Sequence, residues 1–328
     1  MHVLVTGGAG FIGYHLTEAL LATGVQVTAV DNLNDYYAVD LKQARLERLA
    51  RHQELRFIQL DIADRQATAE LFENNRFDAV IHLAAQAGVR YSIDHPQSYV
   101  DANLVGFMNI LEGCRRKQVG HFMFASSSSV YGMNTKCPFG TRDRTDHPVS
   151  LYAATKKSNE LLAYSYSHLY GLPTTGLRFF TVYGPWGRPD MAYFKFTRAI
   201  LTGTPIDVYN NGQMQRDFTY IDDIVHCLKL LIAKTPAVSR PAGSNAQAPY
   251  QLFNIGNHSP ITLTRFIEAI ESACGKQAIK KLLPMQPGDV PVTYADIDDL
   301  VETLDYSPQT TIEKGIERFV DWYRSYYH

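Results

Sequence analysis

The sequence has few cysteines, and their positions suggest no shared role. Cys114, Cys137, Cys227 and Cys274 are far apart in the 328 residues and form no CxxC pair, zinc spacing or plausible disulfide framework. We therefore expect four packing residues in a cytoplasmic protein. The 11 histidines form no cluster with carboxylates at metal-ligand spacing, so no metal site is predicted.

Long apolar runs and an excess of basic residues are also missing. No stretch approaches the roughly 18–20 apolar residues of a membrane span, and the first residues read as a strand, not as a secretory signal. The 31 Lys and Arg residues against 33 Asp and Glu give a net charge of −2, which argues against a general nucleic-acid binder. We expect neither a membrane nor a nucleic-acid partner.

The sequence does contain a regular alternation of short apolar runs with amphipathic segments. Such alternation predicts an α/β fold, a Rossmann-type doubly wound parallel sheet covered by helices on both faces. The strands are expected at 3–5, 25–30, 57–60, 79–83, 121–125 and 174–178, and the helices at 11–22, 68–74, 103–117 and 152–170.

The alternation loosens after about residue 180, where prolines and glycines cluster in 183–189. We expect residues 1–180 to form a first domain, with 215–233 and 250–257 returning to it, and residues 181–328 to form a smaller α/β domain. Within the second part, helices are predicted at 191–201, 222–233, 264–273 and 312–323, a strand at 206–209 and an exposed loop at 235–249.

Three glycines mark a candidate dinucleotide site. Gly7, Gly10 and Gly13 directly follow the first predicted strand and open the first helix. Glycine lets the backbone approach a pyrophosphate at the positive end of the helix. Asp31 closes the second strand about 20 residues on, where a carboxylate would bond ribose hydroxyls and repel a 2′-phosphate, which favours NAD over NADP. Asp61, after the third strand, either reaches the adenine or caps a turn.

Tyr152 and Lys156 are a candidate base and its activator. Residues four apart share one face of a helix. A free tyrosine, with a pKa near 10, is a poor base at neutral pH. A neighbouring ammonium favours the phenolate, so we expect Lys156 to lower the pKa of Tyr152. Lys156 is also expected to hold a nicotinamide ribose.

A serine run follows the strand predicted at 121–125, at the sheet edge where ligands bind in such folds. A hydroxyl there can bridge a substrate alcohol to Tyr152, although capping hydroxyls in a loop give the same pattern. Asn103, a poor helix former, either organises a water-bridged proton path or bends its helix. The run comprises Ser126, Ser127, Ser128 and Ser129.

Taken together, the glycine triplet, Asp31, the serine run with residues 130–132 (VYG) and the Tyr152/Lys156 pair resemble the extended short-chain dehydrogenase/reductase superfamily. The resemblance spans the whole chain. Within that superfamily four strings resemble the UDP-glucuronate 4-epimerases: 31–37 (DNLNDYY), 84–92 (AAQAGVRYS), 178–191 (RFFTVYGPWGRPDM) and 286–290 (QPGDV).

This resemblance implies an isomerase that interconverts UDP-glucuronate and UDP-galacturonate through transient oxidation at C4 by bound NAD. It implies a catalytic triad of Ser127, Tyr152 and Lys156, and a homodimer in which 103–117 and 152–170 pair as a four-helix bundle. It also implies a cofactor site of Gly7, Gly10, Phe11, Ile12, Gly13, Asp31, Asn32, Asp61, Ile62, Leu83, Ala84, Ala85, Asn103, Tyr152 and Lys156.

The substrate of such an enzyme carries two phosphates and one carboxylate, and guanidinium groups suit both. Arg90 and Arg188 lie in loops of the candidate site, and the resemblance places Arg216 on the diphosphate and Tyr209 at the uracil. Gln286 can donate a hydrogen bond but adds no charge. Arg178 ends a buried strand, so we expect a structural ion pair there. Ser128, Ser129, Thr181 and Arg188 would restrain the carboxylate, and Ser127 is a further substrate-side candidate.

The sequence also leaves other functions open. A decarboxylase that makes a UDP-pentose shares the first hydride transfer but usually has a glutamate in the segment 127–129. A 4,6-dehydratase would require an Asp-Glu pair where serines stand. A neutral UDP-hexose epimerase would leave Arg188 and the serine cluster unexplained. A non-catalytic NAD-sensing protein would not require Tyr152, Lys156 and the serine run together.

Overall fold

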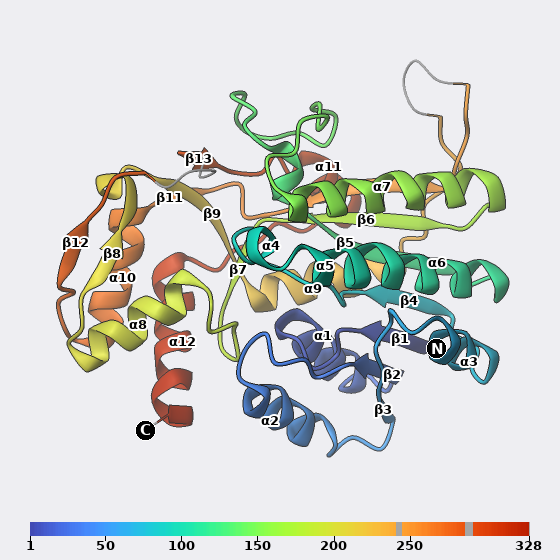
Figure 1. Ribbon diagram of the computed structural model, residues 1–328, viewed down its shortest axis with the longest axis horizontal. Helices are drawn as coiled ribbons and strands as arrows, with labels where there is room; N and C mark the ends of the chain where they lie inside the picture. The colour runs from blue at the N-terminus through green and yellow to red at the C-terminus, as the bar shows by residue number, and fades with distance from the viewer. Residues whose placement is uncertain (241–244, 286–290, 328) are drawn as a thin grey trace.

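A parallel sheet of seven strands runs through the middle of the molecule (Figure 1). The computed structural model describes residues 1–240, 245–285 and 291–327. The strand order is β10-β6-β5-β4-β1-β2-β3, and neighbouring strands are parallel throughout. The strands are β1 (His2–Thr6), β2 (Gln26–Asp31), β3 (Leu55–Gln59), β4 (Ala79–His82), β5 (His121–Ser127), β6 (Thr174–Phe179) and β10 (Tyr250–Ile255).

Both faces of this sheet are buried, which explains why its strands read as continuous apolar runs. Val3 and Val5 of β1 pack into one apolar cluster, whereas Leu4 between them packs into another on the opposite face. The helices around the sheet are α1 (Phe11–Leu21), α2 (Val39–Leu49), α3 (Arg65–Glu73), α4 (Tyr91–Asp94), α5 (Pro96–Tyr99), α6 (Phe107–Arg116), α7 (Leu151–Tyr170) and α9 (Ile221–Ile232).

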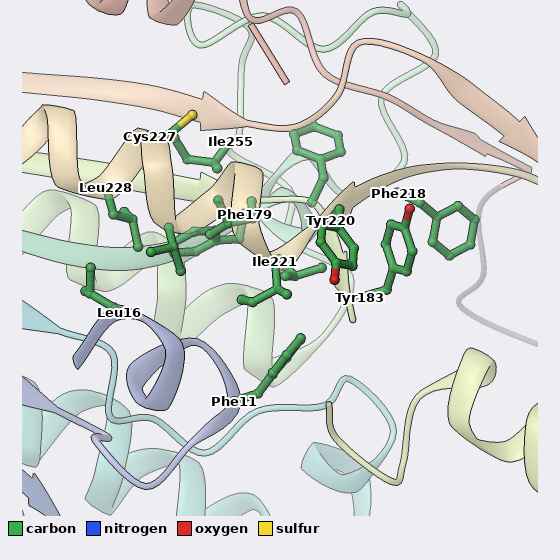
Figure 2. Packing of buried hydrophobic residues seen from close by; sticks show 14 of the residues in the cluster. Phe11, Leu16, Phe179, Tyr183, Phe218, Tyr220, Ile221, Cys227, Leu228 and Ile255 are labelled. Carbon is green, nitrogen blue, oxygen red and sulfur yellow. The ribbon is translucent and has the colours of Figure 1, made fainter. Parts of the chain in front are cut away.

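Helix α9 comes from the second half of the chain but packs on the first. Phe11 and Leu16 of α1 face Ile221 and Leu228 of α9 in the same apolar cluster (Figure 2). Phe179, at the end of β6, also belongs to this cluster. The opposite face carries α3, α6 and α7, and α6 and α7 run side by side across it (Figure 1).

The remaining elements form a smaller unit beside the carboxyl ends of the strands. Strand β9 pairs with β11 in antiparallel fashion and with β7 and β13 in parallel, and β8 pairs with β12. The elements are β7 (Thr181–Tyr183), α8 (Ala192–Thr202), β8 (Ile206–Val208), β9 (Gln215–Tyr220), β11 (Pro260–Thr262), α10 (Leu263–Cys274), β12 (Lys280–Leu282), β13 (Val292–Thr293), α11 (Asp298–Leu304) and α12 (Ile312–Tyr327).

The predicted α/β alternation and parallel sheet are confirmed, but several elements differ from the expectation. Helix α2 was not expected, because its sequence is rich in charged residues. The helix expected over 103–117 begins as the π-helix η1 (Val100–Gly106), and regular α-helix starts only at Phe107. Residues 215–220, expected to return to the first domain, form β9 in the smaller sheet, whereas α9 packs on α1 and β10 joins the large sheet.

The division into two domains itself stays a prediction. The expected loop at 235–249 includes residues 241–244, which lie outside the described residues, and its flanks meet at a bridge between Ser239 and Ala248.

A buried ion pair ties α7 to β6. The Nε and Nη2 atoms of Arg178 each donate to one carboxylate oxygen of Glu160 at 2.8 Å, and both side chains are nearly inaccessible to solvent. Ser126 also donates to Glu160, at 2.7 Å. Although burial opposes ionisation, Arg178 lowers the pKa of Glu160 below its usual range. The expected structural pairing of Arg178 is therefore confirmed.

We expect Arg178→Met to lower the free energy of unfolding by about 3–5 kcal/mol, because it leaves the Glu160 carboxylate buried without its partner. Urea denaturation followed by circular dichroism measures this change. Arg115→Met removes a more exposed partner, that of Glu112, and should lower the free energy of unfolding much less. Equal losses in the two variants would contradict the assignment of Arg178.

Candidate active site

A cavity of about 630 Å³ lies where β1, β4 and β5 end, between the large sheet and the smaller unit. This is the edge at which open parallel sheets bind their ligands. Of the predicted site residues that the structure describes, all but Asn103 and Tyr209 line it. Residues that are distant in sequence, from the glycine loop to Arg216, thus share one space.

In the glycine loop, residues 7–13, the backbone at the start of α1 packs closely against the backbone that follows β1. A Cβ on Gly13 would lie 2.1 Å from the carbonyl oxygen of Gly7, and one on Gly7 would lie 2.8 Å from the Ala84 nitrogen. Gly7 also has φ +71°, which favours glycine. Gly10 caps α1 without a side-chain bond, and the first turn contains no acidic residue. The positive end of α1 therefore faces the cavity and suits a diphosphate.

Two carboxylates stand beside this loop. Asp31 accepts hydrogen bonds from the Ala9 and Leu33 nitrogens at 3.2 and 2.9 Å. Asp61 accepts from the Ala63 nitrogen at 2.9 Å and from the Asn32 amide at 3.1 Å. Both line the cavity while they shape their own loops. For Asp61, the two roles considered from sequence are therefore compatible.

Tyr152 and Lys156 enter the cavity from the first turns of α7. Ser150 caps this helix by accepting from the Ala153 nitrogen at 3.1 Å, which fixes where it begins. The Nζ atom of Lys156 donates to the Ala125 carbonyl of β5 at 2.8 Å. The hydroxyl of Ser127, next to that strand end, accepts from the Ser129 hydroxyl at 2.9 Å.

The pKa values at this end of the cavity differ from the sequence expectation. Burial raises the pKa of Tyr152, while hydrogen bonding to Ser127 and the charge of Arg188 act in the opposite direction. Burial also lowers the pKa of Lys156 to about 8. The prediction that Lys156 lowers the pKa of Tyr152 is therefore wrong for this state. The reason is that Lys156 donates to β5, while Tyr152 is desolvated against the ring of Tyr99.

Arg188 makes a two-point ion pair on the substrate side of the cavity. Its Nε and Nη2 atoms lie 3.0 and 2.6 Å from the two carboxylate oxygens of Asp190. The hydroxyl of Tyr36 donates to Asp190 at 3.3 Å. Although burial opposes ionisation of Asp190, Arg188 lowers its pKa below the usual range. Arg188 is therefore charged and held in place before any ligand arrives.

Two further arginines line the same cavity. The guanidinium of Arg90 lies 5.6 Å from the ring centroid of Tyr209. Arg216 donates to the Gln215 and Pro291 carbonyls at 2.8 and 3.2 Å. Together with Arg188, they make this side of the cavity suitable for a ligand with several negative charges.

Three predicted site residues do not line the cavity or are not described. The buried Asn103 side chain bonds both backbone groups of Gln86, at 2.8 and 3.0 Å, and the Thr155 hydroxyl at 3.1 Å. It braces the π-helix η1 and does not face the cofactor side of the cavity. Tyr209 does not line the cavity, but its ring lies under the guanidinium of Arg90, which does. Gln286 lies outside the described residues.

Lys42, Tyr36 and Asp190 also line the cavity, although the sequence did not single them out. Lys42 lies 3.8 Å from Asp31 and is buried. Tyr36 and Asp190 lie within the sequence strings that carry the family resemblance, so those strings were the signal that could have identified them.

Within the part of the chain that the structure describes, no cluster of metal-ligating side chains is found, and no helix has the length and apolarity of a membrane span.

Comparisons with known proteins agree with this geometry. The model of the NAD dependent epimerase/dehydratase family matches residues 3–256. Protein CapI of Staphylococcus aureus is 53% identical, over 100% of this chain and 99% of that protein. A probable UDP-glucuronate 4-epimerase of Rhizobium meliloti is 48% identical, over 100% and 98%.

Solved structures agree as well. The UDP-glucuronic acid 4-epimerase of Bacillus cereus, in complex with UDP-glucuronic acid and NAD, matches with a TM-score of 0.89 and 33% identity, over 100% of both chains. The UDP-glucose 4-epimerase of Thermotoga maritima, with UDP-glucose, matches with a TM-score of 0.85 and 29% identity, again over 100% of both chains.

We expect Lys156→Met to raise the free energy of unfolding at pH 7 by about 1–3 kcal/mol, because the buried ammonium is costly. Below its folded pKa of about 8, Lys156 is charged in both states, and the cost is present in full. From there up to the unfolded value of 10.5, the folded protein binds fewer protons. The wild-type protein then gains stability with pH, and the difference between the two proteins shrinks.

Urea denaturation of both proteins at pH 7 and pH 10 checks this. The exposed Lys195→Met is the control, and it should not stabilise the protein. A variant that is less stable than the wild-type protein at pH 7 would show that burial does not penalise this lysine.

Proposed function

The chain belongs to the NAD dependent epimerase/dehydratase family, and we propose that it is a UDP-glucuronate 4-epimerase that interconverts UDP-glucuronate and UDP-galacturonate. One observation carries this proposal: a single cavity joins the glycine loop, the Tyr152 and Lys156 pair, and the prearranged cation of Arg188. Relatives named UDP-glucuronate 4-epimerase are 47–49% identical along 99% or more of this chain.

The residues present fit NAD. Gly13 packs so closely on Gly7 that a Cβ would collide with the Gly7 carbonyl, and the end of α1 offers backbone N–H groups for the pyrophosphate. Asp31 at the end of β2 suits ribose hydroxyls. When bound, NAD supplies a hydride acceptor that is regenerated within each turnover. The chain's own residues orient the dinucleotide, exclude water and move the proton.

In this proposal Tyr152 takes the proton of the sugar 4-hydroxyl, with Ser127 bridging the two. Burial raises the pKa of Tyr152, so the phenol must first give its proton to solvent, and nearby positive charge must stabilise the phenolate that then accepts the proton of the 4-hydroxyl. Lys156 is buried at the same end of the cavity and can supply that charge when it leaves the Ala125 carbonyl for a ribose. Ser127 stabilises the phenolate by donating a hydrogen bond.

The carboxylate of a uronate makes decarboxylation a possible side reaction. Oxidation at C4 makes a β-keto acid, which loses CO₂ when the bond to the carboxylate stands perpendicular to the keto plane. We propose that Arg188, with the Thr181 and Ser128 hydroxyls, holds the carboxylate away from that geometry. Ser129 extends this hydroxyl cluster, and Arg90 and Arg216 meet the diphosphate.

The alternatives fit the cavity less well. A decarboxylase would place a glutamate in the segment where Ser127, Ser128 and Ser129 line the cavity. A neutral-hexose epimerase gives no use to a half-buried, prearranged cation at Arg188. The geometry therefore supports the uronate epimerase best.

We further propose a cytoplasmic homodimer. All four cysteines are free thiols, which is typical of a reducing compartment. Leu161 and Leu169 of α7 are exposed by 61% and 63%, and Val105 beside α6 is also exposed. These apolar side chains support pairing of α6 and α7 with the same helices of a second copy, as a four-helix bundle.

We expect the purified protein to convert UDP-glucuronate without added NAD, because the cofactor is restored in each turnover. NMR identifies the product, and heating the protein should release NAD. Tyr152→Phe should lose about 10²–10⁴-fold in rate while releasing the same amount of NAD. No conversion by wild-type protein that does carry NAD would reject the proposed function.

We expect Arg188→Ala to release CO₂ and form UDP-pentose, because the uronate carboxylate is no longer held. Thr181→Ala should do the same to a smaller degree. NMR of the nucleotide sugars measures the fraction of product that is pentose. Arg198→Ala, an exposed arginine on α8, serves as the control and should form none. If neither site variant makes pentose, the carboxylate is held elsewhere.

A further inference from the structure

An unusual buried arginine links the two sides of the cavity. Arg45 of α2 is among the largest fully buried side chains, and within the described part of the chain no carboxylate pairs with it. Its Nη1 donates to the Ala9 carbonyl at 2.7 Å, and its Nη2 donates to the Trp186 carbonyl at 2.6 Å. One guanidinium thus joins the glycine loop to the segment that carries Arg188.

That segment, residues 184–190, has an unfavourable backbone conformation. Trp186 has φ +59°, which is uncommon for a residue with a side chain. A Cβ on Gly187 would lie 2.0 Å from the Tyr193 hydroxyl. His15 of α1 also bonds the Pro185 carbonyl, at 2.9 Å. A strained backbone of this kind persists only where surrounding contacts hold it in place.

A second contact reaches the same segment from the residues that lead into α2. The Tyr36 hydroxyl donates to Asp190, and Asp190 in turn accepts from the Nε and Nη2 atoms of Arg188. The next residue, Tyr37, accepts from Arg45 at 2.8 Å. Residues 36–45 therefore contact residues 184–190 at two places. Arg45 bonds the backbone of Trp186, and Tyr36 bonds the side chain of Asp190.

We propose that Arg45 and Tyr36 are positioning residues for Arg188, and that they thereby determine how much of the oxidised substrate is epimerised and how much is decarboxylated. This inference rests on the proposed function. Neither residue need touch the reacting atoms. Arg45 fixes the backbone of Trp186 and Gly187, and Tyr36 fixes the carboxylate that orients the Arg188 guanidinium.

The competing reactions make this positioning measurable. If the carboxylate swings perpendicular to the 4-keto plane, the C5–C6 bond breaks. Its electron pair enters the keto group as an enolate, CO₂ leaves, and C5 then takes a proton. The hydride that was removed from C4 returns to either 4-keto sugar, so both products balance without an outside reductant. A small displacement of Arg188 therefore changes the product ratio.

Tyr36→Phe is the first test, because it removes only the hydroxyl that bonds Asp190. We expect the pentose fraction of the product to rise about 3- to 30-fold, the range typical of such indirect effects. The fraction is an internal ratio, so it does not depend on how much protein is folded. Tyr91→Phe is the matched control, since Tyr91 packs on Tyr36 at 4.8 Å and has no described bond to Asp190. It should leave the ratio unchanged.

Arg45→Lys is the second test, because an ammonium cannot span both the Ala9 and Trp186 carbonyls as the planar guanidinium does. We expect a similar rise in pentose and a higher KM for UDP-glucuronate. Arg48→Ala is the control on the same helix, since Arg48 lies over the Trp186 ring at 5.4 Å without bonding that carbonyl. It should change neither value.

The outcomes separate this inference from the proposed function. If the wild-type protein converts no UDP-glucuronate, the proposed function fails. If the wild-type protein epimerises it, and Tyr36→Phe and Arg45→Lys keep the wild-type product ratio and KM, then only the positioning role is overturned. A variant that is merely destabilised would lose rate in proportion to folded protein, with the product ratio unchanged, and this also overturns the role.

Discussion

The architecture of the site depends on one close backbone contact, that between the first turn of α1 and the end of β1. Gly13 sits so near the Gly7 carbonyl that no side chain fits between them. This contact turns the intervening loop toward the cavity and presents Ala9 to two partners at once. The Ala9 nitrogen donates to Asp31, and its carbonyl accepts from Arg45. The cofactor side and the substrate side of the cavity therefore share a single fixed point.

Around that point, long-range contacts hold the halves of the chain together. Helix α9 packs on α1 across the apolar cluster of Figure 2, so the second half of the chain completes the core of the first. On the opposite face, the Glu160–Arg178 ion pair joins α7 to β6. It lies one helical turn from Lys156, so a rigid helix carries both the structural pair and the candidate chemistry. The cofactor side of the site is thus built on regular elements, and of the substrate-side arginines Arg90 and Arg188 come from loops while Arg216 comes from β9.

Local signals allowed much of this arrangement to be predicted. The Gly7, Gly10 and Gly13 spacing, the Tyr152 and Lys156 pair and the α/β alternation depend on neighbours in sequence, and the comparisons support the fold and function that they indicated. What was missed depends on distant partners. Helix α2 has no continuous apolar stripe that would predict it from the sequence. Arg45 is nevertheless buried there, because it bonds Trp186 and Gly187. The pKa of Tyr152 follows from burial, which spacing along a helix does not reveal.

The place of β10 in the large sheet also governs how the protein is made. Its partner β6 ends at Phe179, but β10 is formed by Tyr250–Ile255. A ribosome must therefore synthesise about 70 further residues before the outer edge of β6 is covered. Until then the nascent chain presents an unpaired strand of apolar and threonine residues, the kind of edge that recruits other chains. The outer edge of β6 is thus covered only after most of the cofactor-side sequence has been synthesised.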